Sequence, residues 1–164
     1  MNINDLIYVN NFGVSKIIDF KDDIVYIEPL SGTKGVICVK QDSKTLRKLS
    51  TKEEIDKILI EVANTPTIWV AKFIERSNLY TSLKNNPTPL KRFVMLKTIY
   101  EHYKFKKDNK IKGGLATKDI EFFRKSLSLI TLEFTTVLNI SVDELKNYIS
   151  TLWNNDTIYE YYLI

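Results

Sequence analysis

The side chains that most often carry out chemistry in proteins are scarce in this sequence. Its 164 residues include one histidine, His102, and one cysteine, Cys38. Because a zinc site needs three or four Cys, His or carboxylate ligands, this inventory excludes the usual zinc cages. Cys38 falls in a strand-like segment and His102 in a helix-like one, so no Cys–His pair is indicated. The sequence therefore predicts neither a metal site nor thiol catalysis.

The remaining signs of catalysis are also missing. No glycine-rich phosphate loop is formed, since "SGTKG", residues 31–35, lacks the Walker spacing. The acidic groups in "KEEID" and "VDEL" fall in the first turns of expected helices, where carboxylates stabilise the helix dipole. We therefore expect a protein that is not an enzyme, with no cofactor and no small-molecule substrate.

A more distinctive set of side chains lies in "TPTIWVAKFIERS", residues 65–77. On a helix, Trp69, Lys72 and Arg76 would fall within about 60° of one another. An indole at such a border can pack on the aliphatic stems of the two cations. It can also face a nucleic acid, with the cations on phosphates and the ring against a base. Periodicity alone favours packing, because large aromatic residues are mostly buried, and it leaves both interpretations open.

Positive charge is concentrated in the middle of the chain. Residues 67–113 carry 11 Lys and Arg against 3 Asp and Glu, whereas residues 1–66 have a net charge of −1 and residues 114–164 of −3. A general bias toward lysine would not spare both flanks. The distribution therefore favours a polyanionic partner for the middle segment.

The elements that must position these residues change type along the chain. Residues 3–40 contain short β-branched runs separated by turn signals, which predict four or five strands in a small antiparallel barrel or strongly bent sheet. Helical periodicity follows from Ser50 or Thr51, with further helices expected over residues 67–84, 89–107, from a cap at Thr117, and over 141–153. We expect an α+β protein with a β module (1–48), a helical module of about five helices (49–153) and an aromatic tail (154–164).

The cellular setting follows from absences. No run of about 18 apolar residues is present, which predicts that the protein does not enter a membrane. The first residues lack the basic and apolar regions of a signal peptide, and the single cysteine cannot form an internal disulfide. We expect a cytoplasmic protein.

One junction of the sequence resembles a known family. "KTLRKLSTKEEIDKILIEV", residues 44–62, is similar to the link between the β module and the first helix of the CarD/CdnL family of bacterial RNA polymerase-binding regulators. The opening strands, with Tyr8 and "GVSKI" at residues 13–17, look like those of the same family. So does "GGLATKDIEFFRKSLSLITLEF", residues 113–134. The resemblance covers about residues 3–150 through order, spacing and length.

The resemblance implies a function and a set of contacts. A Tudor-like β module would bind the RNA polymerase β subunit, through Asp23, Val25, Val36 and Cys38. The helical module would contact promoter DNA at the upstream edge of the melted region, where the tryptophan, here Trp69, wedges into the minor groove and stabilises the open complex. The DNA contacts expected on this basis are Trp69, Lys72, Arg76, Lys84, Lys91 and Arg92.

The local sequence departs from the family pattern. Trp-x-x-Arg-Tyr-Lys-x-Asn is matched at Trp69, at the cation Lys72 and at the aromatic Phe73, but Ile74 replaces the next cation and Arg76 the asparagine. Asp23 and Cys38 fall where some members carry arginines at the polymerase contact. An alternative therefore stays open: an adaptor of the same fold that binds polymerase or another protein without specific DNA contact.

Overall fold

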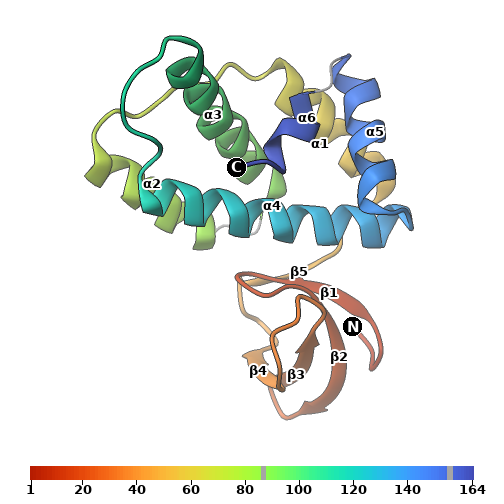
Figure 1. Ribbon diagram of the computed structural model, residues 1–164. Coiled ribbons are helices and arrows are strands. Elements are labelled where there is room, and N and C mark those ends of the chain that lie inside the picture. Colours follow the sequence, from red (N-terminus) through yellow and green to blue (C-terminus); the bar gives the residue numbers. More distant parts are fainter. Residues whose placement is uncertain (86–87, 155–156) are drawn as a thin grey trace.

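The computed structural model describes residues 1–85, 88–154 and 157–164, and consists of an antiparallel sheet followed by a group of helices (Figure 1). The strands in these ranges are β1 Leu6–Val9, β2 Gly13–Lys21, β3 Ile24–Pro29, β4 Ile37–Lys40 and β5 Leu46–Lys48. The helices are α1 Lys52–Asn64, α2 Phe73–Asn85, α3 Pro89–Asp108, α4 Thr117–Leu138, α5 Val142–Trp153 and α6 Thr157–Tyr161. The predicted α+β organisation, strands first and helices after, is confirmed.

The sheet has the strand order β4-β3-β2-β1-β5, and all of its pairs are antiparallel. Alternating side chains place one face inward, where the buried cluster is Ile7, Val9, Ile17, Val25 and Ile27. Because β4 and β5 stand at the ends of the order, each pairs with one neighbour in the described chain. A register shift between Ile17 and Asp19 bends β2.

The helices enclose a second, larger apolar cluster. Apolar residues of α4 at a helical spacing of 4, 3 and 4 point into it, since Phe123, Leu127, Ile130 and Phe134 are all buried. Thr51 caps α1 as expected, since its hydroxyl accepts from the Glu54 amide and the Glu54 carboxylate accepts from the Thr51 amide. Among the described helices, none has the length and apolarity that a membrane crossing needs.

The aromatic tail packs onto the helices. Ile158 and Tyr161 of α6 are buried, and the Tyr161 ring lies 4.5 Å from Tyr100 and 5.8 Å from Phe123. The Nε of Arg124 donates to the Ile164 carbonyl at 3.1 Å. The last residues therefore close the helical core rather than extend from it.

Two predicted helix boundaries are wrong. The second helix begins at Phe73 instead of residue 67, and α4 is capped by Ala116, with Thr117 as its first helical residue. The break predicted at 85–89 includes residues 86 and 87, which lie outside the described residues. The first error matters for function, because it places Trp69 on an extended segment and not on a helix.

Sheet and helices meet along α4 in a junction that is largely buried. The Arg47 guanidinium of β5 donates to both carboxylate oxygens of Glu133 at 2.6 Å, and the amide and hydroxyl of Ser50 each donate to the same carboxylate at 3.0 Å. Gly13, at the start of β2, faces Leu129 so closely that a Cβ there would lie 2.7 Å from its Cδ2. Figure 1 shows the sheet lying against this side of α4.

Candidate functional site

Trp69 lies in the extended segment between α1 and α2, at the helical end of the molecule. Its ring stacks on His102 of α3, with centroids 3.7 Å apart and planes 7° from parallel. The side chain is half-buried against the helical core, whereas its neighbour Ile68 is 77% exposed. The indole is therefore held in place without being sealed inside.

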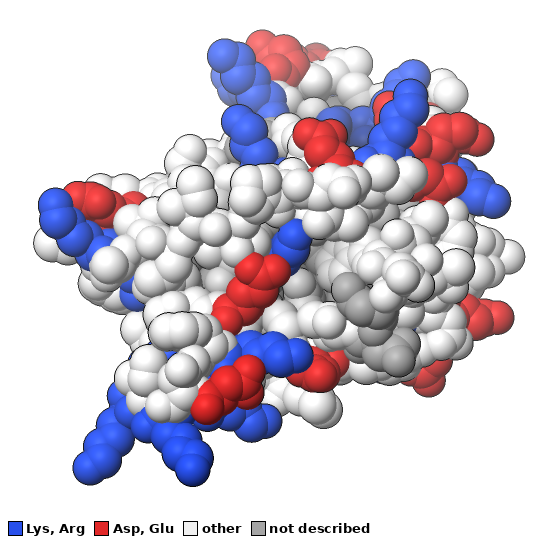
Figure 2. All heavy atoms as spheres, turned by 90° about the horizontal axis from the view of Figure 1, so that it is seen from above, with Lys and Arg blue, Asp and Glu red and all other residues white. Residues whose placement is uncertain are grey.

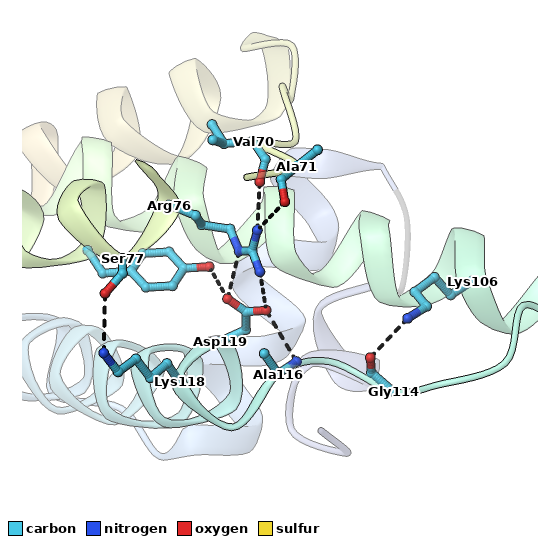
Figure 3. Close-up of polar contacts among 10 residues, drawn as sticks. Val70, Ala71, Arg76, Ser77, Lys106, Gly114, Ala116, Lys118 and Asp119 are labelled. Atoms are coloured by element: carbon cyan, nitrogen blue, oxygen red, sulfur yellow. Dashed lines mark hydrogen bonds and ion pairs between the residues drawn. The ribbon is translucent and has the colours of Figure 1, made fainter. Parts of the chain in front are cut away.

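Arg76 fixes the backbone of this segment. Its Nη1 donates to the carbonyls of Val70, at 2.7 Å, and Ala71, at 3.2 Å (Figure 3). Its Nε and Nη2 donate to the two carboxylate oxygens of Asp119, at 2.8 and 3.0 Å. The guanidinium carbon also lies 4.3 Å from the Trp69 ring centroid. One side chain thus ties the Trp69 segment to the first turn of α4.

Asp119 is the buried anchor of this arrangement. It accepts from the hydroxyl of Tyr80 at 2.8 Å and from the amide of Ala116 at 3.3 Å, in addition to Arg76. The hydrogen bonds to Asp119 raise the pKa of Arg76, and burial followed by the Asp119 contact raises the pKa of Tyr80. Arg76 therefore stays charged and Tyr80 stays neutral near neutral pH.

A hollow of about 250 Å³ opens beside the indole. It is lined by Trp69, Ala71, Arg76, His102, Lys106, Asp119 and residues 114–116. Lys106 spans it, donating from Nζ to the Gly114 carbonyl at 2.9 Å (Figure 3). An aromatic wall beside a lysine suits a flat or anionic group.

The six residues expected to contact DNA do not form one surface. Lys72 is exposed beside Trp69, where it pairs with Glu75 at 3.0 Å. Lys84 and Lys91 are exposed but belong to the other end of the α2–α3 pair, since Lys91 lies about 16 Å along α3 from His102. The helix relation predicted for Trp69, Lys72 and Arg76 does not exist.

The expected exposure of Arg76 and Arg92 is wrong. Arg76 is 6% exposed and Arg92 is 3% exposed. Arg92 donates from Nη1 to the Tyr8 hydroxyl at 2.6 Å, and from Nη2 to Asn10 Oδ1 and the Leu83 carbonyl, each at 3.2 Å. Both guanidinium groups are therefore structural, one holding the Trp69 segment and the other joining α3 to β1.

The residues expected to contact polymerase lie on and around β4. Val36 and Cys38 are exposed on or just before this edge strand, and Asp23 is exposed in the turn before β3. Val25 differs, because it is fully buried in the sheet core and its side chain reaches no partner. The predicted polymerase contact through Val25 is therefore wrong.

Local sequence patterns do not predict several of the residues that lie near Trp69. His102, Lys106, Asp119 and Lys118 are near it only through the fold, with Lys118 lying 5.5 Å from the Phe73 ring centroid. The one local signal of this site is Asp119, a carboxylate in the first turn of α4, three residues after the cap Ala116. Within the described ranges, no group of three His, Cys, Asp or Glu side chains is placed to hold a metal ion.

Comparison with protein-family models and with curated protein sequences found no match to this chain.

The His102 ring is expected to make stability depend on pH. Burial, with Lys106 and Arg76 nearby, lowers the pKa of His102 below its ordinary value, so the neutral ring is the one stacked on Trp69. Below about pH 6.5 the unfolded chain binds a proton that folded His102 does not, so the free energy of unfolding should fall with acidification. Urea unfolding at pH 7.5 and 5.5 measures this difference.

The matched variant for this measurement is His102→Phe. Phenylalanine keeps a flat ring against Trp69 and cannot titrate, and the chain has no other histidine. The decrease in the free energy of unfolding from pH 7.5 to 5.5 should be smaller in the variant than in the parent protein. An identical decrease in both proteins would contradict the assignment.

Proposed function

We propose that the protein is a cytoplasmic transcription regulator that binds the RNA polymerase β subunit through a Tudor-like sheet and presents Trp69 to promoter DNA. The observation that carries the proposal is a partly exposed tryptophan on a rigidly held segment between α1 and α2. The Arg76–Asp119 pair fixes the backbone on the C-terminal side of the indole, and Ile68 and Lys72 beside it are exposed. The resemblance to the CarD/CdnL family supplies the partners.

The wedge role agrees with this chemistry. An apolar side chain that enters the minor groove must be rigid, because it replaces base stacking with its own contacts. The indole has two such supports in His102 and Arg76, and Lys72 offers a cation for a nearby phosphate. A protein that binds the melted promoter better than the closed one shifts the equilibrium toward melting by its difference in affinity.

The sheet has a surface suited to the polymerase side. β4 pairs only with β3 among the described strands, which leaves a backbone edge for another strand. Val36, 55% exposed, and Cys38 lie at that edge and offer apolar contact. Asp23 in the adjacent turn adds one negative charge.

The burial of Arg76 and Arg92 favours a second candidate. With two of the expected phosphate contacts committed to internal bonds, the chain would act as an adaptor that binds polymerase or another protein and leaves DNA untouched. Binding of the purified protein to duplex DNA separates the two functions, since phosphate contacts make affinity fall steeply with salt.

Replacing Trp69 with alanine is expected to shorten the lifetime of the open promoter complex about 10-fold, because the melted state loses an apolar wedge that contributes about 1.4 kcal/mol. Polymerase binding should stay unchanged. The control is Trp153→Phe, which removes the other indole, whose Nε1 donates to the Leu59 carbonyl inside the helical core. A lifetime unaffected by Trp69→Ala would end the wedge proposal.

A further inference from the structure

The end of α3 and the turn that follows it carry an unusual density of lysine. We propose that Lys104, Lys106, Lys107, Lys110 and Lys112, here named the α3-end lysines, form a second surface that binds the phosphates of duplex DNA beside Trp69. This inference rests on the proposed function, and it assigns the phosphate contacts to residues other than the buried arginines.

The charge of this surface is not neutralised. Residues 104–114 contain five lysines and one aspartate, a net +4 that equals the formal net charge of the whole chain. Lys104 has a loose contact with Glu160 at 3.9 Å, with both side chains about half exposed. Among the residues that the structure describes, no carboxylate lies at ion-pair distance from Lys107, Lys110 or Lys112. These cations are available to an external anion.

The turn that carries the α3-end lysines is ordered by its own hydrogen bonds. The Ile111 amide donates to the Lys106 carbonyl at 2.9 Å, and the Lys110 amide donates to the Lys107 carbonyl at 3.1 Å. This is a Schellman ending, with Lys110 in the left-handed region at φ 54°. Lysine, rather than glycine or asparagine, thus occupies a strained position. The backbone that presents the charges is therefore largely fixed before binding, which lowers the entropy lost on contact.

The lysines are continuous with the indole. Lys106 lines the same hollow as Trp69 and His102, and Lys72 and Lys118 stand at the start of α2 and α4 nearby. Figure 2, which looks down on the helical side, shows Lys and Arg toward the margins with Asp and Glu among them, and a largely uncharged area between these groups. The contact expected is therefore local to the α3-end lysines and the hollow beside Trp69, and not spread over a uniformly basic face.

Duplex DNA fits this surface better than a membrane. A helix that lies on a membrane needs a row of apolar residues at helical spacing. At the end of α3 the exposed apolar residues are Phe105, 56% exposed, and Ile111, 46% exposed. Ile68, Phe73 and Ile74, exposed beside Trp69, belong to the segment before α2 and to its first turn, so no single helix carries such a row. Lysines spread over a turn match a phosphate backbone, where each contact releases a counterion.

The test is the salt dependence of binding to a labelled duplex of about 20 base pairs. The variant Lys107→Gln/Lys110→Asn/Lys112→Gln removes three charges and keeps the turn, since asparagine tolerates the left-handed region. Lys106 is left in place because it holds the Gly114 carbonyl. We expect the slope of log affinity against log salt to fall by about 2–3, and affinity near 0.1 M salt to fall about 100-fold.

The matched control is Lys21→Gln/Lys34→Gln/Lys40→Gln, which removes the same charge from exposed positions of β2, β4 and the loop between β3 and β4. Equal duplex affinities and equal salt slopes for the two triple variants would overturn the inference. So would lysine-dependent binding to anionic vesicles without binding to DNA. Open-complex lifetime is measured on the same proteins. If Trp69→Ala leaves that lifetime unchanged while the α3-end variant loses duplex affinity, the lysine surface stands and the promoter role fails.

Discussion

Replacing Glu133 with alanine is expected to lower the free energy of unfolding by about 3–5 kcal/mol, since it removes one partner of a buried ion pair. Glu133 is fully buried in α4 and accepts two bonds of 2.6 Å from Arg47 and two of 3.0 Å from Ser50. In the variant, a largely buried guanidinium loses this carboxylate and the Ser50 amide loses its acceptor. Urea unfolding, followed by tryptophan fluorescence, measures the change.

Two comparisons give this prediction its control. Glu121→Ala removes an exposed carboxylate from the same helix and should alter stability by less than about 0.5 kcal/mol. Glu133→Gln keeps an oxygen for Ser50, so its change in the free energy of unfolding should lie between those of Glu121→Ala and Glu133→Ala. If the free energy of unfolding of Glu133→Ala lies within about 1 kcal/mol of the parent value, which is below the range for a broken buried pair, the junction contributes little to stability.

Replacing Asp119 with alanine should have an effect of similar size, about 3–5 kcal/mol, and should also release the Trp69 segment. Asp119 is 1% exposed and holds Arg76, which in turn holds the carbonyls of Val70 and Ala71. Without it, a buried guanidinium has no counter-charge and the backbone beside the indole loses its anchor. The expected result is lower stability, together with an altered near-ultraviolet circular dichroism signal from Trp69.

A second variant separates stability from positioning. Arg76→Met/Asp119→Leu replaces the pair with apolar side chains of similar volume, an exchange that is often neutral or stabilising. Stability should recover in the double variant, whereas open-complex lifetime should stay as short as in Trp69→Ala, because the carbonyl contacts of Arg76 are gone. A double variant with full promoter activity would show that Arg76 does not position Trp69.

Local patterns in the sequence predict much of this fold. Alternating β-branched residues mark the strands, and the spacing of Phe123, Leu127, Ile130 and Phe134 marks the buried face of α4. The capping pair Thr51 and Glu54 sets the start of α1. Each of these signals depends on residues a few positions apart, so a single sequence carries it.

The candidate site is predicted less well because long-range contacts determine it. Arg76 and Asp119 are 43 positions apart, and Arg92 and Tyr8 are 84 apart. Helical spacing places Arg76 on an exposed basic edge, but its side chain takes the carbonyls of Val70 and Ala71, and the preceding segment stays extended. Two arginines that look like phosphate ligands are thereby internal, and the exposed cations include the lysines at the end of α3 and in its turn.

Because Gly13 has no side chain, the sheet packs closely against α4. The hydrogen bonds of Arg47 with Glu133 and of Arg92 with Tyr8 hold the two parts together. The span from the open edge of β4 to the indole is thus a property of the molecule before anything is bound. Two partners bound at the edge of β4 and at the indole would therefore be held at a fixed distance from each other. Lateral contacts between the sheet and the helices, and not the length of the chain that connects them, set that separation.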